Sequence, residues 1–101
     1  MPDLPIVCTL TPDALRTRRA GFLSELLRRA EGHDDLPDGL RLRFAPTRDT
    51  LSTIAGVVEA ERQCCRFLRF RIIVERDAGP IMLDLSGPPG TREFVAALLK
   101  V

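Results

Sequence analysis

Side chains with special chemistry are scarce in this chain. It has no tryptophan or tyrosine, its only histidine is His33, and its only lysine is Lys100. A multi-histidine zinc site within one chain is therefore excluded, as is a haem or flavin site built on stacked aromatic rings. The other basic residues are arginines, which indicates either a compositional bias of the genome or anion recognition by guanidinium groups.

Long apolar runs are also missing. No stretch approaches the roughly 20 apolar residues that span a bilayer. The first residues, MPDLPIVCTL, lack the basic start and long apolar core of a signal peptide. These absences predict a cytoplasmic protein with no membrane partner. The formal net charge of +1 argues against nucleic acid as a partner, because a strong sequence-independent grip on it needs a basic surface.

Length and composition predict one domain over residues 1–101. With 45% hydrophobic and 29% charged residues, the chain has the balance of a globular protein rather than a disordered one. A domain of this length buries a modest core.

The apolar pattern predicts an α+β fold in the order β-α-β-α-β-β-α. Apolar residues alternate in four short segments, which favours strands at 6–10, 40–45, 70–74 and 81–85. The last two are expected to form a hairpin with a loop of several residues. We expect about four mostly antiparallel strands with three helices packed on one face. The opposite face is then solvated, and a second copy of the chain is one candidate to cover it.

Helical spacing predicts where the three helices lie. The first begins at Pro12, runs to about Ala30, ends at Gly32 and leads into a polar loop, HDDLPDG. The second begins in the turn APTRDT, where either Thr47 or Asp49 caps it, and runs to about Phe67. A last short helix follows residue 91.

One carboxylate falls on the apolar stripe of the second helix. At about 100° per residue, its buried arc is defined by Leu51, Ile54, Val57, Val58 and Leu68. Glu61 lies near the centre of this arc, and Arg19 interrupts the stripe of the first helix in the same way. Because a buried carboxylate needs a partner, we predict a supporting ion pair between Arg19 and Glu61. The alternative is that both side chains lie at the rim and reach solvent.

Two adjacent thiols follow that carboxylate. Cys64 and Cys65 come three and four residues after Glu61, the spacings at which helical side chains meet. The wheel predicts that Cys65 is buried and Cys64 accessible. Cys8 shares a strand face with Ile6 and Leu10 and so faces the helices. A disulfide between helical neighbours is disfavoured by its geometry, and simple burial as small apolar residues is an alternative.

If Cys8 meets the adjacent pair, three sulfur ligands converge. Three sulfurs without histidine differ from the usual closed zinc site, which has four ligands. A linear or trigonal thiophilic ion, such as Hg(II), a trivalent arsenical or Cu(I), suits this number better. The metal ligands would be Cys8, Cys64 and Cys65, and a thiophilic metal ion is the one cofactor that the sequence suggests.

The segment ERQCCRFLRF, residues 61–70, carries a resemblance. It resembles a segment E-R-x-C-C-x-F-L-x-F in small, largely uncharacterised bacterial proteins, which also share motifs like residues 8–12, 36–44 and 83–90. The segment also looks similar to tails or neighbours of mercury-resistance-type regulators. The resemblance implies an association with thiophilic metals or metalloids, and it carries over to Cys8, Glu61, Cys64 and Cys65. Arg66 departs from it, since such proteins often have proline or serine there.

Three functions stay open on these residues. The first is a module that binds or senses a soft metal or metalloid, with a metal-responsive regulator as its partner. The second is a structural or interaction protein that forms a homodimer and whose cysteines are merely buried. The third, an enzyme, is less favoured: a thiol would act on organometals or redox substrates, with Glu61 as the candidate catalytic group that moves a proton.

Arginines on two predicted strands suggest a further surface. The residues are Arg41, Arg43, Arg69 and Arg71. They are expected to line one solvated face, which is either an anion-binding surface or an ordinary charged one.

Overall fold

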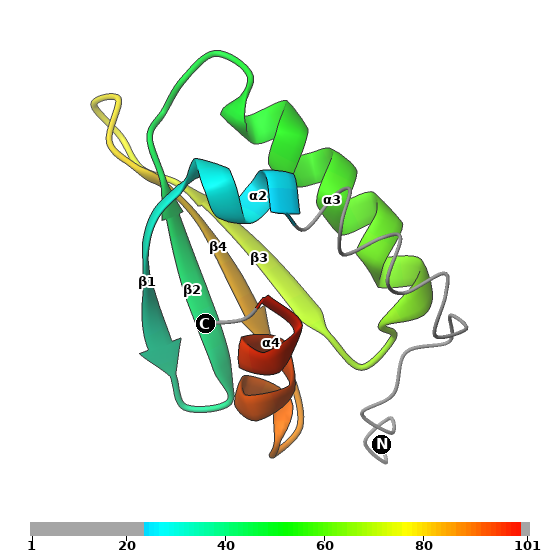
Figure 1. Ribbon diagram of the computed structural model, residues 1–101. Helices are drawn as coiled ribbons and strands as arrows, with labels where there is room; N and C mark the ends of the chain where they lie inside the picture. The colour runs from blue at the N-terminus through cyan, green and yellow to red at the C-terminus, as the bar shows by residue number, and fades with distance from the viewer. Residues whose placement is uncertain (1–23, 100–101) are drawn as a thin grey trace.

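The computed structural model describes residues 24–99 (Figure 1). Along the chain the elements are α2 (Ser24–Arg29), β1 (Ala30–Leu36), β2 (Gly39–Phe44), α3 (Thr50–Cys64), β3 (Arg69–Val74), β4 (Ile81–Ser86) and α4 (Thr91–Leu99).

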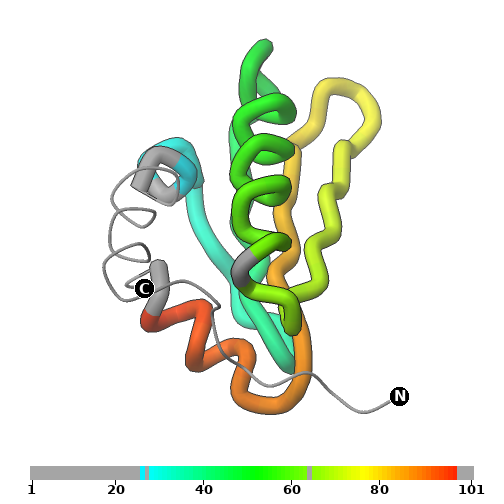
Figure 2. The backbone as a smooth tube through the Cα atoms, turned by 90° about the vertical axis from the view of Figure 1, so that its right-hand side faces the viewer, coloured from blue at the N-terminus to red at the C-terminus, as the bar shows by residue number. Residues whose placement is uncertain are grey.

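The strands form one antiparallel sheet in the order β1-β2-β4-β3. Two hairpins, β1-β2 and β3-β4, lie side by side, with β2 and β4 in the centre. Helix α3 connects the two hairpins, and Figures 1 and 2 show α2, α3 and α4 on the same side of the sheet. The predicted α+β class, the four-stranded antiparallel sheet and the β3-β4 hairpin are confirmed.

The predicted order of elements is wrong in the described part, where it is α-β-β-α-β-β-α. Residues 30–36 form a strand rather than a helix end and a polar loop, because their backbone pairs with β2. The predicted strand at residues 6–10 lies outside the described residues. The count of three helices is not confirmed either, since only six residues of the first predicted helix are described, as α2.

The core lies between the sheet and the helices. Strand residues Leu40, Leu42, Phe44, Ile81, Leu83 and Leu85 form one buried cluster with helix residues Leu26, Ile54, Val57 and Val95. Each buried side chain of this size contributes about 1.5–3 kcal/mol relative to exposure. The central strands approach closely at Gly39, where a Cβ would lie 1.9 Å from the carbonyl oxygen of Leu85. Only glycine fits there without moving the backbone.

Helix α3 begins after one of its two predicted capping residues but ends earlier than predicted. Asp49 stands at the N-cap position, but its side chain makes no capping hydrogen bond and instead pairs with Arg29 at 3.0 Å. The helix ends at Cys64 rather than near Phe67. Leu51, which was expected inside, is 43% exposed.

Within residues 24–99 no helix is both long and apolar enough to cross a bilayer.

The hairpin loop between β3 and β4 contains a tight turn. The N–H of Gly79 donates to the carbonyl of Arg76 at 3.1 Å. The two residues between them, Asp77 and Ala78, have φ of 58° and 55°. Positive φ at both central positions is typical of a type I′ turn, whose twist matches that of an antiparallel hairpin.

Candidate thiol and carboxylate site

A buried thiol and a buried carboxylate meet at the end of α3. The Sγ atom of Cys65 lies 3.8 Å from Oε2 of Glu61, a distance at which the thiol donates a weak hydrogen bond. Glu61 is 2% exposed and Cys65 is 0% exposed. The predicted burial of both side chains and their one-turn contact are therefore confirmed.

The backbone at the end of the helix sets this contact. The N–H of Cys65 still donates to the carbonyl of Glu61 at 2.8 Å, as in a continuing helix. Cys65 then leaves helical geometry with φ −107° and ψ 72°. A turn follows, in which the N–H of Leu68 donates to the carbonyl of Cys65 at 3.1 Å. Cys65 thus keeps the i, i+4 relation to Glu61 although it is the first residue outside α3.

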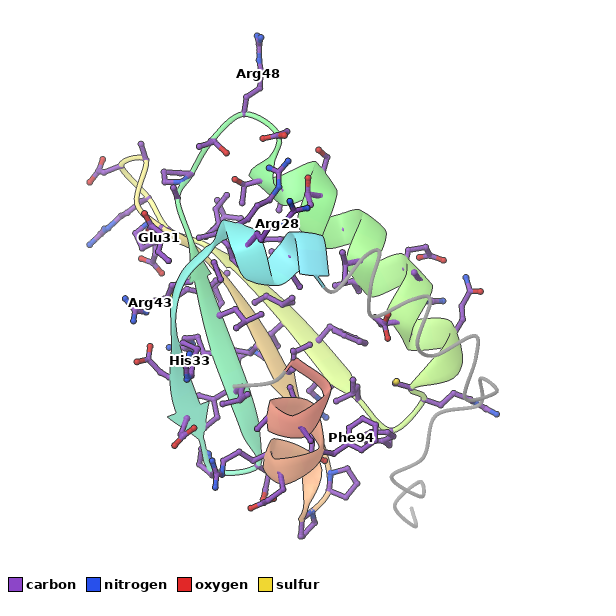
Figure 3. The ribbon with its side chains drawn as sticks, viewed as in Figure 1. Arg28, Glu31, His33, Arg43, Arg48 and Phe94 are labelled. Atoms are coloured by element: carbon purple, nitrogen blue, oxygen red, sulfur yellow. The ribbon has the colours of Figure 1, made fainter. Side chains whose placement is uncertain are left out.

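Apolar side chains close over the thiol. Cys65 and Phe67 form a small buried cluster, against which Leu68 and Phe94 pack. The rings of Phe67 and Phe94 meet edge to face, with centroids 5.0 Å apart and planes at 85°. Figure 3 shows Phe94 reaching from α4 towards the segment that follows α3. Side chains from α4 and from the segment after α3 therefore pack together beside the thiol, which lies in an apolar environment.

The other predicted site residues are described in part or not at all. Cys64 is the last residue of α3, and its side chain is not among those described, so its accessibility stays a prediction. Cys8 and Arg19 lie outside the described residues. Both the three-sulfur convergence and the Arg19–Glu61 ion pair therefore stay predictions. Among residues 24–99, no group of three or more His, Cys, Asp or Glu side chains is arranged to hold a metal ion.

A second buried carboxylate, Asp84, was not predicted from the sequence. It lies on β4 and is 2% exposed. Arg41 of β2 holds it with two hydrogen bonds, Nε to Oδ1 at 2.7 Å and Nη2 to Oδ2 at 2.9 Å. The hydrogen bond and charge of Asp84 raise the pKa of Arg41 above its ordinary value. The signal in the sequence was the alternation of Leu83, Asp84 and Leu85, which places Asp84 on the solvated face.

The solvated face of the sheet carries opposite charges in alternation. Asp34, Arg41, Asp84 and Arg71 stand opposite one another across the four strands. Arg43, the next residue on this face of β2, donates to Asp34 at 3.1 Å. The strand pairing places Arg41, Arg43, Arg69 and Arg71 on this one face, as expected. Two of these arginines are matched by carboxylates, which fits a charged surface better than an anion site.

Comparison with known proteins finds no counterpart: no protein-family model, no curated protein and no solved structure matches the chain.

Proposed function

We propose that the C-terminal end of α3 is a thiol site that binds a soft metal or metalloid ion. The contact between the Cys65 thiol and the Glu61 carboxylate carries this proposal. Cys65 supplies one sulfur, Cys64 supplies a second from the adjacent position, and Cys8 completes a trigonal set. Thiolates select ions such as Hg(II), trivalent arsenic and Cu(I) over hard cations.

Glu61 has a defined task in this proposal. A thiol binds a metal as its thiolate, so metal binding releases a proton from the sulfur. The carboxylate of Glu61 accepts the hydrogen bond that the Cys65 thiol donates. It takes the proton as the sulfur–metal bond forms and passes it to solvent. Because Cys65 is buried, the turn formed by residues 65–68 has to open for the ion to enter.

The cellular setting follows from the chemistry. Thiols stay reduced in the cytoplasm, where an ion of this class is toxic or scarce and has to be detected or sequestered. We propose that the chain acts there and that a metal-responsive regulator is its partner. Only the resemblance of residues 61–70 supports this partner. No contact among the described residues bears on it.

The test is a titration of the reduced full chain with Hg(II) and with arsenite. Absorbance of the sulfur–metal bond and the rise in thermal stability both report binding, since an ion that binds the folded state stabilises it. We expect Cys8→Ser, Cys64→Ser and Cys65→Ser each to weaken binding by about tenfold or more, because each removes one thiolate ligand. The control is His33→Ala, which removes an exposed potential ligand on β1 and should leave the affinity unchanged.

Two outcomes would count against the site. Equal affinity in the wild type and the three cysteine variants would exclude the sulfur ligands. Binding that survives in Cys8→Ser alone would reduce the site to the adjacent pair. Turnover of an organomercurial compound that is lost in Glu61→Gln would instead indicate a thiol enzyme with Glu61 as its proton-transfer group.

A further inference from the structure

The two edges of the sheet differ in how they are protected. At one edge, β1 carries an irregularity in its pairing between Ala30 and Gly32. It also carries the acidic residues Glu31, Asp34 and Asp35. A bulge and charged side chains are devices that keep an edge strand from pairing with another chain. At the other edge, β3 pairs with β4 in unbroken register and has neither a bulge nor a proline, and its only charged residues are Arg69 and Arg71 on the solvated face.

Apolar side chains are exposed along β3. Ile72 is 38% exposed and Val74 is 58% exposed, and these are two of the three large apolar residues that are exposed in the described part of the chain. They stand opposite Leu83 and Ile81 of β4, so they lie on the face that the helices cover elsewhere. Figure 2 views the molecule from the side of β3 and shows this strand beside α3 rather than behind it. Within residues 24–99, no other strand pairs with the outer edge of β3.

Strand geometry limits how a second copy fits this edge. Residues opposite one another in an antiparallel pair point to the same face, so apolar positions must oppose apolar positions. A twofold axis at Arg71 would set two arginines against each other. An axis at Ile72 sets Ile72 against its own copy and Phe70 against Val74 of the second copy.

The same register matches charges at its ends. Arg69 then lies opposite Glu75 of the second copy, twice by symmetry. Glu75 directly follows the last residue of β3, and its N–H still donates to the carbonyl of Pro80 across the hairpin at 3.4 Å. Both side chains are exposed, and the pairing of Arg69 with Ser86 places Arg69 on the solvated face. Opposite charges in facing positions stabilise a strand pair.

We propose that β3 pairs antiparallel with β3 of a second copy about a twofold axis at Ile72, joining two sheets into one. Contact between like edges closes after two copies. Pairing β3 with β1 would give an open chain of copies, and the irregular start of β1 disfavours it. The contact is smaller than the roughly 20–30 residues a side of a standard interface. The dimer should therefore dissociate on dilution.

The first experiment measures the mass of the reduced full chain by sedimentation over a wide range of concentrations. Reductant is present so that disulfide-linked pairs are not counted. We expect a monomer–dimer equilibrium in the wild type. Ile72→Lys sets two lysines against each other and should weaken the dimer by about tenfold or more. The matched control, His33→Lys, adds the same charge on the opposite edge strand and should leave the equilibrium unchanged.

A charge exchange tests the register itself. Arg69→Glu and Glu75→Arg each set like charges opposite one another, and each should weaken the dimer by about threefold to tenfold. The double variant restores opposite charges and should restore the affinity. Unfolding curves of all variants establish that the fold is retained. A monomeric wild type, assemblies larger than a dimer, or no recovery in the double variant would overturn the proposal.

Discussion

The Sγ atom of Cys65 lies 3.8 Å from Oε2 of Glu61, and neither side chain is more than 2% exposed. Burying this pair costs folding free energy, because a buried carboxylate loses its hydration. The pair lies at the end of a helix, next to the aromatic contact of Phe67 and Phe94. The thiol is consequently shielded from reagents in solution while remaining beside a proton acceptor.

The shielding predicts slow reaction of Cys65. In a Cys8→Ser, Cys64→Ser double variant, Cys65 is the only thiol left. We expect a disulfide reagent to label this folded protein roughly a hundredfold or more slowly than the protein in denaturant, because labelling requires local opening. The labelling rate is followed by absorbance. Rapid labelling in native buffer would show that the turn at residues 65–68 does not cover the sulfur.

The predicted ion pair between Arg19 and Glu61 can be measured by a double-mutant cycle. We expect Arg19→Met and Glu61→Gln each to lower the free energy of unfolding, and the double variant to lower it by less than their sum. The coupling should be about 0.5–3 kcal/mol, the range for residues in contact. The exposed pair of Arg62 and Glu59, 3.8 Å apart, is the control and should couple weakly. Additive effects of Arg19→Met and Glu61→Gln would rule out the contact.

Even a conservative substitution in the bidentate pair of Arg41 and Asp84 should lower the stability of the fold. Asp84→Asn keeps the shape but loses the charge and one acceptor, and Asp84→Ala loses both hydrogen bonds. We expect both variants to unfold at lower urea concentration than the wild type, with Asp84→Ala the less stable. The matched control is Asp34→Ala, because Asp34 pairs with Arg43 on the same face and both of these side chains are exposed. Equal losses at the two positions would contradict a special role for the buried carboxylate.

Three of the four strands could be predicted from the sequence, and one could not. Strands β2, β3 and β4 follow the alternation of apolar residues, which is a local signal. Strand β1, with the sequence AEGHDDL, has no such alternation, because an edge strand exposes most of its side chains. Its place in the sheet comes from pairing with β2, in which Asp34 and Asp35 lie opposite Arg41 and Leu40. No residue pattern within β1 itself reports that pairing.

The site divides in the same way. The contact of Glu61 with Cys65 depends only on helical spacing, and it was predicted although the helix ends before Cys65. The burial of Asp84 depends on the register between β2 and β4, which joins residues 43 positions apart. Sequence reasoning places Asp84 on a face but cannot show which arginine covers it. Local geometry was therefore predictable, whereas burial through a distant partner was not.

The pair of Asp49 and Arg29 predicts a small dependence of stability on acid. The hydrogen bond from Arg29 lowers the pKa of Asp49 below its ordinary value of 3.8. A carboxylate with a lowered folded pKa stabilises the protein above its unfolded pKa, and this contribution is lost as the pH falls through the folded pKa. Wild type and Asp49→Asn should therefore differ in unfolding free energy near neutral pH and converge below the folded pKa. A difference that is constant with pH would contradict the linkage.

The turn at Ala78 offers the simplest test of backbone strain. Its φ of 55° lies in the left-handed region, which costs a residue with a Cβ about 1–2 kcal/mol. Ala78→Gly should therefore raise the free energy of unfolding by up to about 1 kcal/mol, after the larger entropy of glycine in the unfolded chain is offset. The control is Ala55→Gly, the same change at an exposed position within α3, which should lower stability by about 0.5–1 kcal/mol. Urea unfolding measures both, and opposite signs are the expected result. Two losses of equal size would show that residue 78 does not hold a positive φ.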